Sequence, residues 1–285
     1  MNIDNECVSC IINQAHRVAT AINASDTLSA KMVANTTKMS KKFSFNSSPP
    51  VIASDVYEQL ALLANKSDLY DEVKKESTKK AISFVPKLQN YLNQSDNLLY
   101  DATKVAIAGN VIDLAAQVSY DLDLELEHIF HTNFAIDDFE KLKKKLEHSK
   151  TLVYLGDNVG EHIFDKLYIE TLSKLFSNLD IYYFTRGTPI INDVTYSEAI
   201  EAGIDSTCSV IDSGVNTPGF DYERASLRAK TLFDEADVVI SKGMGNYECM
   251  SEYTKDNIFF LLKVKCSVVA TSLNSSLGDI ICKKI

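Results

Sequence analysis

Three apolar runs of the sequence end in polar side chains whose types suit the binding of a metal ion and of an anion. Each run is rich in Val, Ile, Tyr or Phe, as expected for a buried strand. In an open parallel sheet, ligands bind beyond the carboxyl ends of the strands, so the residues at these ends are the first candidates for a site. They are Asp157 and Asn158 after TLVYL, Arg186 with Asn192 and Asp193 after DIYYFT, and Lys242 and Gly243 at the end of ADVVIS.

The chemistry that these residues predict is metal-assisted phosphoryl transfer. Carboxylate and carboxamide oxygens are the ligands that Mg²⁺ and Mn²⁺ prefer, and such sites keep open positions for phosphate and water. Asp157, Asn158 and Asp193 supply oxygens of this kind, whereas Arg186 and Lys242 supply positive charge for an anionic group. A metal ion with phosphate-binding cations beside it is the arrangement used by many phosphoryl-transfer enzymes.

Each segment also has a purely structural interpretation when it is taken alone. An Asp-Asn pair after a strand is commonly a turn or a helix cap. The stretch KGMGN, which contains Gly243, lacks the spacing and the Ser or Thr of a P-loop. The metal hypothesis therefore depends on the coincidence of all three strand ends.

Two further motifs carry polar or reactive groups in the expected helical part. Asn110 and Asp113 in AIAGNVIDLAA are three residues apart and share a helical face, where a structural hydrogen-bonding role and a site role are both open. Cys7 and Cys10 in CVSC lie on neighbouring turns of an expected helix. No second pair completes a zinc site, so we interpret them as buried thiols, the alternative being a half-site completed by a partner chain.

The elements that must position these residues fall into two parts. Residues 1–135 show helical periodicity, with a break at SSPP and an interruption at Pro86. From Lys150 onward, short apolar runs alternate with helical segments; the runs are TLVYLG, LDIYYFT, CSVID, ADVVISKG, NIFFLLK and CSVVAT. This alternation predicts an α/β fold with a mainly parallel sheet in residues 136–285, packed against the helical N-terminal part.

Composition excludes several classes of function. The net charge of −10 opposes a general attraction to nucleic acid or to an anionic membrane. The sequence has no run of 18 apolar residues and no signal-peptide pattern at its start, so we expect a cytoplasmic protein with mostly reduced cysteines. The oligomeric state is not indicated by the sequence.

Six segments of the chain resemble, in order and spacing, the family known as domain of unknown function 89, which includes the damage-control phosphatases. They are AGNVIDLAA, LGDNVGEHIFDKLYIE, RGTPIINDVTYSEAIEAGI, VIDSGVNTPG, ADVVISKGMGNYECM and FLLKVKCSVVA. The N-terminal CVSC resembles the bacterial and archaeal branch. The resemblance implies a Rossmann-like α/β part and a metal-dependent phosphatase. It also implies metal ligands at Asp157, Asn158 and Asp193, and pocket residues at Asn110, Asp113, Arg186 and Lys242.

One segment departs from the family pattern. DLYDEVKKESTKKA resembles an Asp-Pro-Tyr segment of the family, but Leu69 stands where proline is usual and the asparagine expected downstream is absent. This departure concerns substrate contacts from the helical part, not the metal centre.

We therefore predict a metal-dependent phosphatase that hydrolyses small phosphorylated metabolites such as sugar phosphates. Asp157, Asp193 and Lys242 are its predicted catalytic residues, and Gly243 adjoins the phosphate. A pocket of oxygen ligands indicates Mn²⁺, Co²⁺, Ni²⁺ or Mg²⁺ as the cofactor. The alternatives are a phosphometabolite-binding or metal-binding protein without turnover, and a Rossmann-like methyltransferase, although LGDNVGE lacks the glycine-rich turn of such a nucleotide site.

Overall fold

A computed structural model describes residues 1–111 and 122–285. Asp113, one of the predicted pocket residues, lies outside the described residues. No helix within these two ranges is long and apolar enough to cross a membrane.

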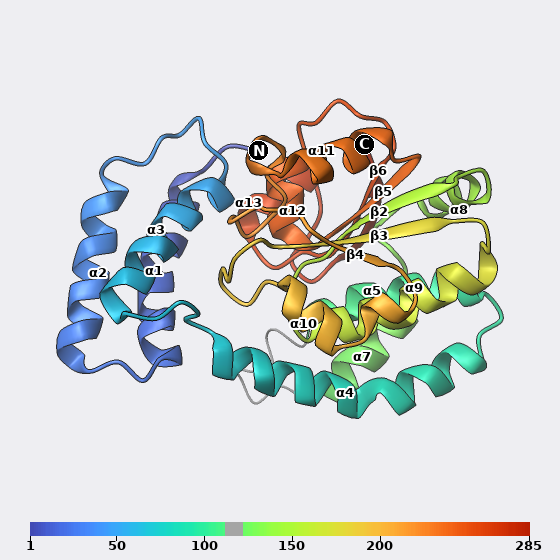
Figure 1. The fold of residues 1–285 in the computed structure, drawn as a ribbon, viewed down its shortest axis with the longest axis horizontal. Coiled ribbons are helices and arrows are strands. Elements are labelled where there is room, and N and C mark those ends of the chain that lie inside the picture. The colour runs from blue at the N-terminus through green and yellow to red at the C-terminus, as the bar shows by residue number, and fades with distance from the viewer. Residues whose placement is uncertain (112–121) are drawn as a thin grey trace.

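Within the described residues, a seven-stranded sheet forms the centre of the molecule (Figure 1). Its order is β1-β7-β6-β5-β2-β3-β4, and all neighbours are parallel except β6 and β7. From β2 onward this is the strand order of a Rossmann sheet, so the predicted α/β fold with a mainly parallel sheet is confirmed. The strands are β1 (Ile136–Asp137), β2 (Thr151–Leu155), β3 (Asp180–Thr185), β4 (Ser209–Asp212), β5 (Val238–Lys242), β6 (Ile258–Lys263) and β7 (Ile280–Lys284).

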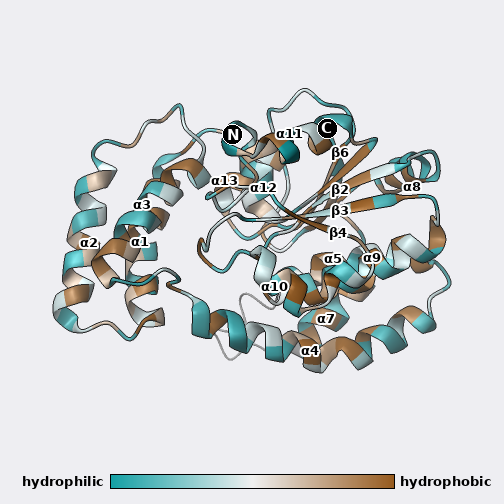
Figure 2. Ribbon diagram, in the orientation of Figure 1, coloured by the Kyte–Doolittle hydropathy of each residue, from teal (hydrophilic) through white to brown (hydrophobic). Residues whose placement is uncertain are grey.

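Helices cover both faces of the sheet, because both faces of its central strands are apolar (Figure 2). In β2, Leu152 and Tyr154 pack into one core cluster, and Val153 and Leu155 into the other. The first face is covered by α5 (Leu98–Ala108), α7 (Leu122–His131), α8 (Phe139–Glu147), α9 (Glu161–Leu175) and α10 (Tyr196–Glu201), and the second by α11 (Leu227–Glu235), α12 (Gly243–Met250) and α13 (Ser267–Leu273). α4 (Asp71–Asn93) packs on the outer side of α5 and α9 (Figure 1).

The first three helices form a separate core cluster at one end of the sheet (Figure 1). They are α1 (Asn5–Ala21), α2 (Asp26–Ser40) and α3 (Pro49–Ala64), and α3 begins at the predicted SSPP break with Ser48 as its N-cap. Ile190, from the segment after β3, is buried in the same cluster. The helical N-terminal part thus contributes to two cores, because α4 to α7 pack with the sheet.

Two local predictions are wrong. CSVVAT, predicted as a strand, lies in α13, where the Cys266 side chain caps the first turn by accepting from the Val269 N–H. Its valines favour a strand by propensity, but Val269 and Leu273, four residues apart, bury one helical face. Pro86 does not interrupt its helix, because α4 continues from Asp71 to Asn93 with apolar contacts on both sides of the proline.

Candidate metal and phosphate site

Asp157 and Asn158 follow β2 at the point where the strand order reverses. β2 lies between β3 and β5, so the residues after these three strands meet at one edge of the sheet. Nδ2 of Asn158 donates to Oδ2 of Asp157 over 2.9 Å. The Asp157 carboxylate rests on Gly243, where an added Cβ atom would lie 1.9 Å from Oδ2 and where φ is +73°. Gly243 is therefore needed both for its backbone conformation and for the space it leaves to Asp157.

Backbone pairing brings Asp193 beside Asp157. Asn158 and Asp193 form an antiparallel bridge, and the N–H of Val194 donates to the carbonyl of Asp157 over 2.8 Å. Ile191, two residues before Asp193, has a φ of +46°, which is rare for a β-branched residue and marks local strain of the kind found at functional loops. The three predicted metal ligands therefore lie together.

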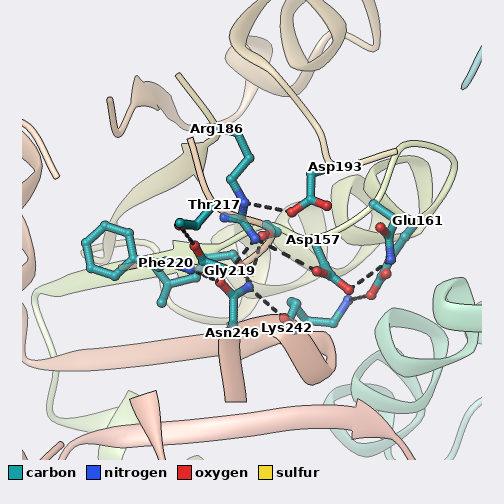
Figure 3. A network of polar contacts seen from close by, with 12 residues as sticks. Asp157, Glu161, Arg186, Asp193, Thr217, Gly219, Phe220, Lys242 and Asn246 are labelled. Carbon is teal, nitrogen blue, oxygen red and sulfur yellow. Dashed lines mark hydrogen bonds and ion pairs between the residues drawn. The ribbon is translucent and has the colours of Figure 1, made fainter. Parts of the chain in front are cut away.

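Arg186 lies beside both carboxylates and is only 1% exposed. Its Nε donates to Oδ2 of Asp193 over 2.7 Å, and its Nη2 lies 3.8 Å from Oδ1 of Asp157 (Figure 3). Nη2 also donates to Oδ1 of Asn246 on α12, which is held in turn by the N–H of Phe220. Nη1 has no partner among the described residues, so it can bind an anion beside the carboxylates.

Lys242 is fully buried at the end of β5. Its Nζ donates to the carbonyl of Ala106 over 2.8 Å, to Oε1 of Glu161 over 2.6 Å and to Oδ1 of Asp165 over 2.5 Å. An ammonium group has three donors, and these contacts use all three. Lys242 is therefore bound to two carboxylates of α9, one of them that of Glu161 (Figure 3).

Two other buried polar atoms in this region have no partner within the described part of the chain. They are Oε2 of Glu161 and Nδ2 of Asn110, and each side chain is 1% exposed. α5 ends and a short 3₁₀ turn, Gly109–Val111, begins where this part of the chain packs on α9. Gly109 permits the approach, because a Cβ atom there would lie 2.8 Å from Cγ of Glu161. One acceptor and one donor thus remain open near the carboxylates.

The electrostatics of the site favour a bound cation. Burial raises the pKa of Asp157 well above its usual range, and the charges of Glu161 and Asp193 raise it further, against opposing effects of Arg186 and Lys265. Burial would lower the pKa of Lys242, but Asp165 and Glu161 outweigh it, so the pKa of Lys242 is raised. Among the buried side chains, Arg186 pairs with Asp157 and Asp193, and Lys242 pairs with Glu161 and Asp165.

Comparison with known proteins places this geometry in a family. Residues 3–281 match the model described as the damage-control phosphatase ARMT1-like domain. The chain belongs to this damage-control phosphatase family. A damage-control phosphatase of Pyrococcus horikoshii is 32% identical over 286 residues, covering 100% of this chain and 98% of the relative. Another, of Archaeoglobus fulgidus, is 27% identical and covers 100% of both chains.

A solved structure from the same family shares the fold. The crystal structure of a DUF89 family protein from Pyrococcus horikoshii has a TM-score of 0.90 and 30% identity, and the match covers 100% of this chain and 99% of that one. The resemblance seen in the sequence motifs is therefore confirmed at the level of family and fold.

Sequence reasoning found one set of buried polar residues and missed another. Asp157, Asn158, Asp193 and Arg186 come together as expected, and Asn110 lies at the contact between α5 and α9. The missed set is Glu161, Asp165 and Asn246. The signal for the first two was present, because EHIFD places two acids four residues apart on a helix that is otherwise apolar at its start.

Proposed function

We propose that the protein is a divalent-cation-dependent phosphatase that hydrolyses phosphomonoesters of small metabolites, with sugar phosphates as the substrate class. The family and the names of its relatives support a phosphatase. The observation that carries the cation is the placement of two buried carboxylates, Asp157 and Asp193, beside each other and beside the amide of Asn158. Like charges in one buried site disfavour each other, and a bound divalent cation would offset this repulsion.

Asp157, Asn158 and Asp193 are the proposed ligands. Two carboxylates and one amide form an oxygen-rich set that fits Mn²⁺, Co²⁺, Ni²⁺ or Mg²⁺ and leaves positions for water and substrate. When bound, such a cation supplies Lewis-acid polarisation of the phosphoryl group. Gly243 contributes by allowing Asp157 to lie against the backbone.

The open donors of the site are the proposed phosphate contacts. Nη1 of Arg186 and Nδ2 of Asn110 are buried and lack described partners, so a phosphoryl oxygen would satisfy them. Arg186 then offsets the charge that develops on the transferred group. Asp113 stays a predicted substrate contact. In this proposal Lys242 does not bind the phosphate, because its three donors are already used, and it acts by positioning Glu161.

The test of the function is phosphate release after chelation and on addition of each cation. We expect no turnover of p-nitrophenyl phosphate or of a panel of sugar phosphates in excess chelator, and turnover with at least one of Mn²⁺, Co²⁺, Ni²⁺ and Mg²⁺. Full activity in excess chelator would remove the metal from the proposal. Binding of the cation and of a sugar phosphate in calorimetry, without phosphate release under any condition, would instead support the alternative of a binding protein.

Asp157→Asn tests the ligand assignment. Asn keeps the size and the capping ability of Asp but removes one of two carboxylate ligands, so we expect a higher metal requirement and turnover lower by about 10²-fold or more. The matched control is Asp212→Asn, at the end of β4, where the exposed carboxylate caps a turn by accepting from the Gly214 N–H. Circular dichroism checks both folds. If Asp157→Asn titrates with metal like the control, Asp157 is only a turn cap.

A further inference from the structure

The two carboxylates that bind Lys242 differ in one respect. Asp165 uses both oxygens: Oδ1 accepts from Lys242 and from the hydroxyl of Tyr154, and Oδ2 accepts from the hydroxyl of Tyr183. Glu161 uses only Oε1, and its Oε2 has no partner among the described residues although the side chain is 1% exposed. Buried carboxylate oxygens are normally hydrogen-bonded, so this open acceptor requires an explanation.

Glu161, which carries the open oxygen, lies near the proposed metal ligands. Glu161 is the first residue of α9, three residues after Asn158. Its charge is the largest Coulombic contribution to the raised pKa of Asp157, ahead of that of Asp193. Figure 3 shows Glu161, Lys242 and Asp157 converging from α9, the end of β5 and the end of β2.

The side chain is held in this orientation from two sides. Lys242 fixes Oε1 at 2.6 Å, and the Cγ methylene lies against Gly109, where an added Cβ atom would be 2.8 Å away. A carboxylate oxygen held in place in this way can accept a hydrogen bond from a water molecule or from a ligand. Asp165, with both oxygens used, has no comparable capacity.

We propose that Glu161 is the general base for the attacking water, an inference that rests on the proposed phosphatase function. Oε2 accepts a proton from the water molecule as the water oxygen bonds to phosphorus and the bond from phosphorus to the leaving oxygen breaks. The leaving oxygen takes a proton from solvent, and Glu161 releases its proton to solvent, so one water is consumed for each alcohol and phosphate formed. Lys242 is the positioning residue that presents Oε2 to this water.

Glu161→Gln separates this role from a structural one. The amide keeps the size of the side chain and an oxygen for Lys242, but it cannot accept a proton from water. We expect kcat to fall by about 10²–10⁴-fold, while KM and the affinity for Mn²⁺ in calorimetry change less than tenfold. Asp165→Asn is the matched control on the other carboxylate of Lys242. It should lower the melting temperature, and its kcat should change less than tenfold.

A second variant tests chemical rescue by formate, which a purely structural role of Glu161 would not allow. Glu161→Ala should regain kcat in proportion to added formate, whereas Asp165→Ala should not. If Glu161→Gln and Asp165→Asn lose stability and turnover in parallel, or if Glu161→Gln raises KM alone, Glu161 is not the base. A wild-type protein without phosphate release would overturn the proposed function and this inference with it; an active wild type with an equally active Glu161→Gln overturns the inference only.

Discussion

Two groups of buried polar side chains lie next to each other at the edge of the sheet, and they differ in how completely their hydrogen bonds are satisfied. The Lys242 cluster (Lys242, Asp165, Tyr154 and Tyr183) has a partner for every ammonium donor and every Asp165 oxygen. The Asp157 site (Asp157, Asn158, Asp193 and Arg186) leaves Nη1 of Arg186 without a described partner.

This difference separates framework from binding site. A fully paired network of buried charges fixes the positions of the elements that carry it, here β2, β3, β5 and α9. An incompletely paired one is costly unless a ligand completes it. Glu161 shares a feature of each group, since its Oε1 is bound to Lys242 and its Oε2 has no described partner. The comparison therefore predicts loss of stability from changes in the Lys242 cluster and loss of metal binding from changes in the Asp157 site.

The largest effect is expected from Lys242→Met. The change leaves Glu161 and Asp165 buried without their cation, so the free energy of unfolding should fall by about 3–5 kcal/mol. Lys104→Met is the matched control, because Lys104 is also a buried lysine whose Nζ donates to a backbone carbonyl, that of Phe130, and no ion pair with a carboxylate is found for it among the described residues. It should cost about 1–3 kcal/mol. Urea unfolding measures both, and equal losses would contradict the framework role.

Gly243→Ala should act on the Asp157 site with a smaller cost in stability. The added methyl group would overlap Oδ2 of Asp157, so the carboxylate must move and we expect Mn²⁺ affinity to fall about tenfold or more, the scale of roughly 1.4 kcal/mol. Gly278→Ala is the control: its φ of +91° is also left-handed, but an added Cβ there meets nothing within 4 Å. Both variants should lose about 1–2 kcal/mol of stability from the backbone alone.

Calorimetry with Mn²⁺ and thermal unfolding separate the two contributions. Equal metal affinity in Gly243→Ala and Gly278→Ala would show that the position of the Asp157 carboxylate does not control metal binding. A loss confined to Gly243→Ala would tie the close contact to the site.

The sequence predicted the parts of this comparison that depend on periodicity. The ends of strands can be predicted from short apolar runs, and the carboxyl ends of parallel strands lie at the same edge of a sheet. The proximity of Asp157, Asp193 and Arg186 could therefore be predicted from the sequence. CSVVAT was misassigned because propensity cannot show that Cys266 caps a helix there.

The hydrogen-bond partners of the buried charged groups could not be predicted in the same way. Lys242 was found as the residue at a strand end, but periodicity does not show that α9 lies beside it and supplies two carboxylates. Asn246 similarly depends on three carbonyl groups of separate residues, those of Leu155, Gly156 and Lys242. Such networks arise from packing between segments far apart in the chain, so single-sequence reasoning locates a site better than it assigns roles within it.

The smallest effect on turnover is expected from the CVSC motif, which lies outside both groups. Cys7 packs in the core cluster of α1 to α3, and burial raises the pKa of its thiol, whereas Cys10 is exposed one turn later. Across residues 1–111 and 122–285, no three His, Cys, Asp or Glu side chains are placed to hold one metal ion together. The prediction of two buried thiols is therefore correct for Cys7 and wrong for Cys10, which is exposed. We expect a structural role for Cys7 and no role in turnover for either thiol.

Serine variants of the two cysteines test this interpretation one at a time and together. Cys7→Ser places a hydroxyl in an apolar core and should cost about 1–3 kcal/mol, while Cys10→Ser should stay within about 0.5 kcal/mol of the wild type, as exposed substitutions do. The double variant should then keep kcat and the metal titration of the wild type, because α1 contributes no side chain to either buried group. Thermal unfolding and phosphate release measure the two quantities separately. A double variant with wild-type stability but without turnover would mean that the thiols act in function, and a change in its oligomeric state would identify them as a site shared with a partner chain.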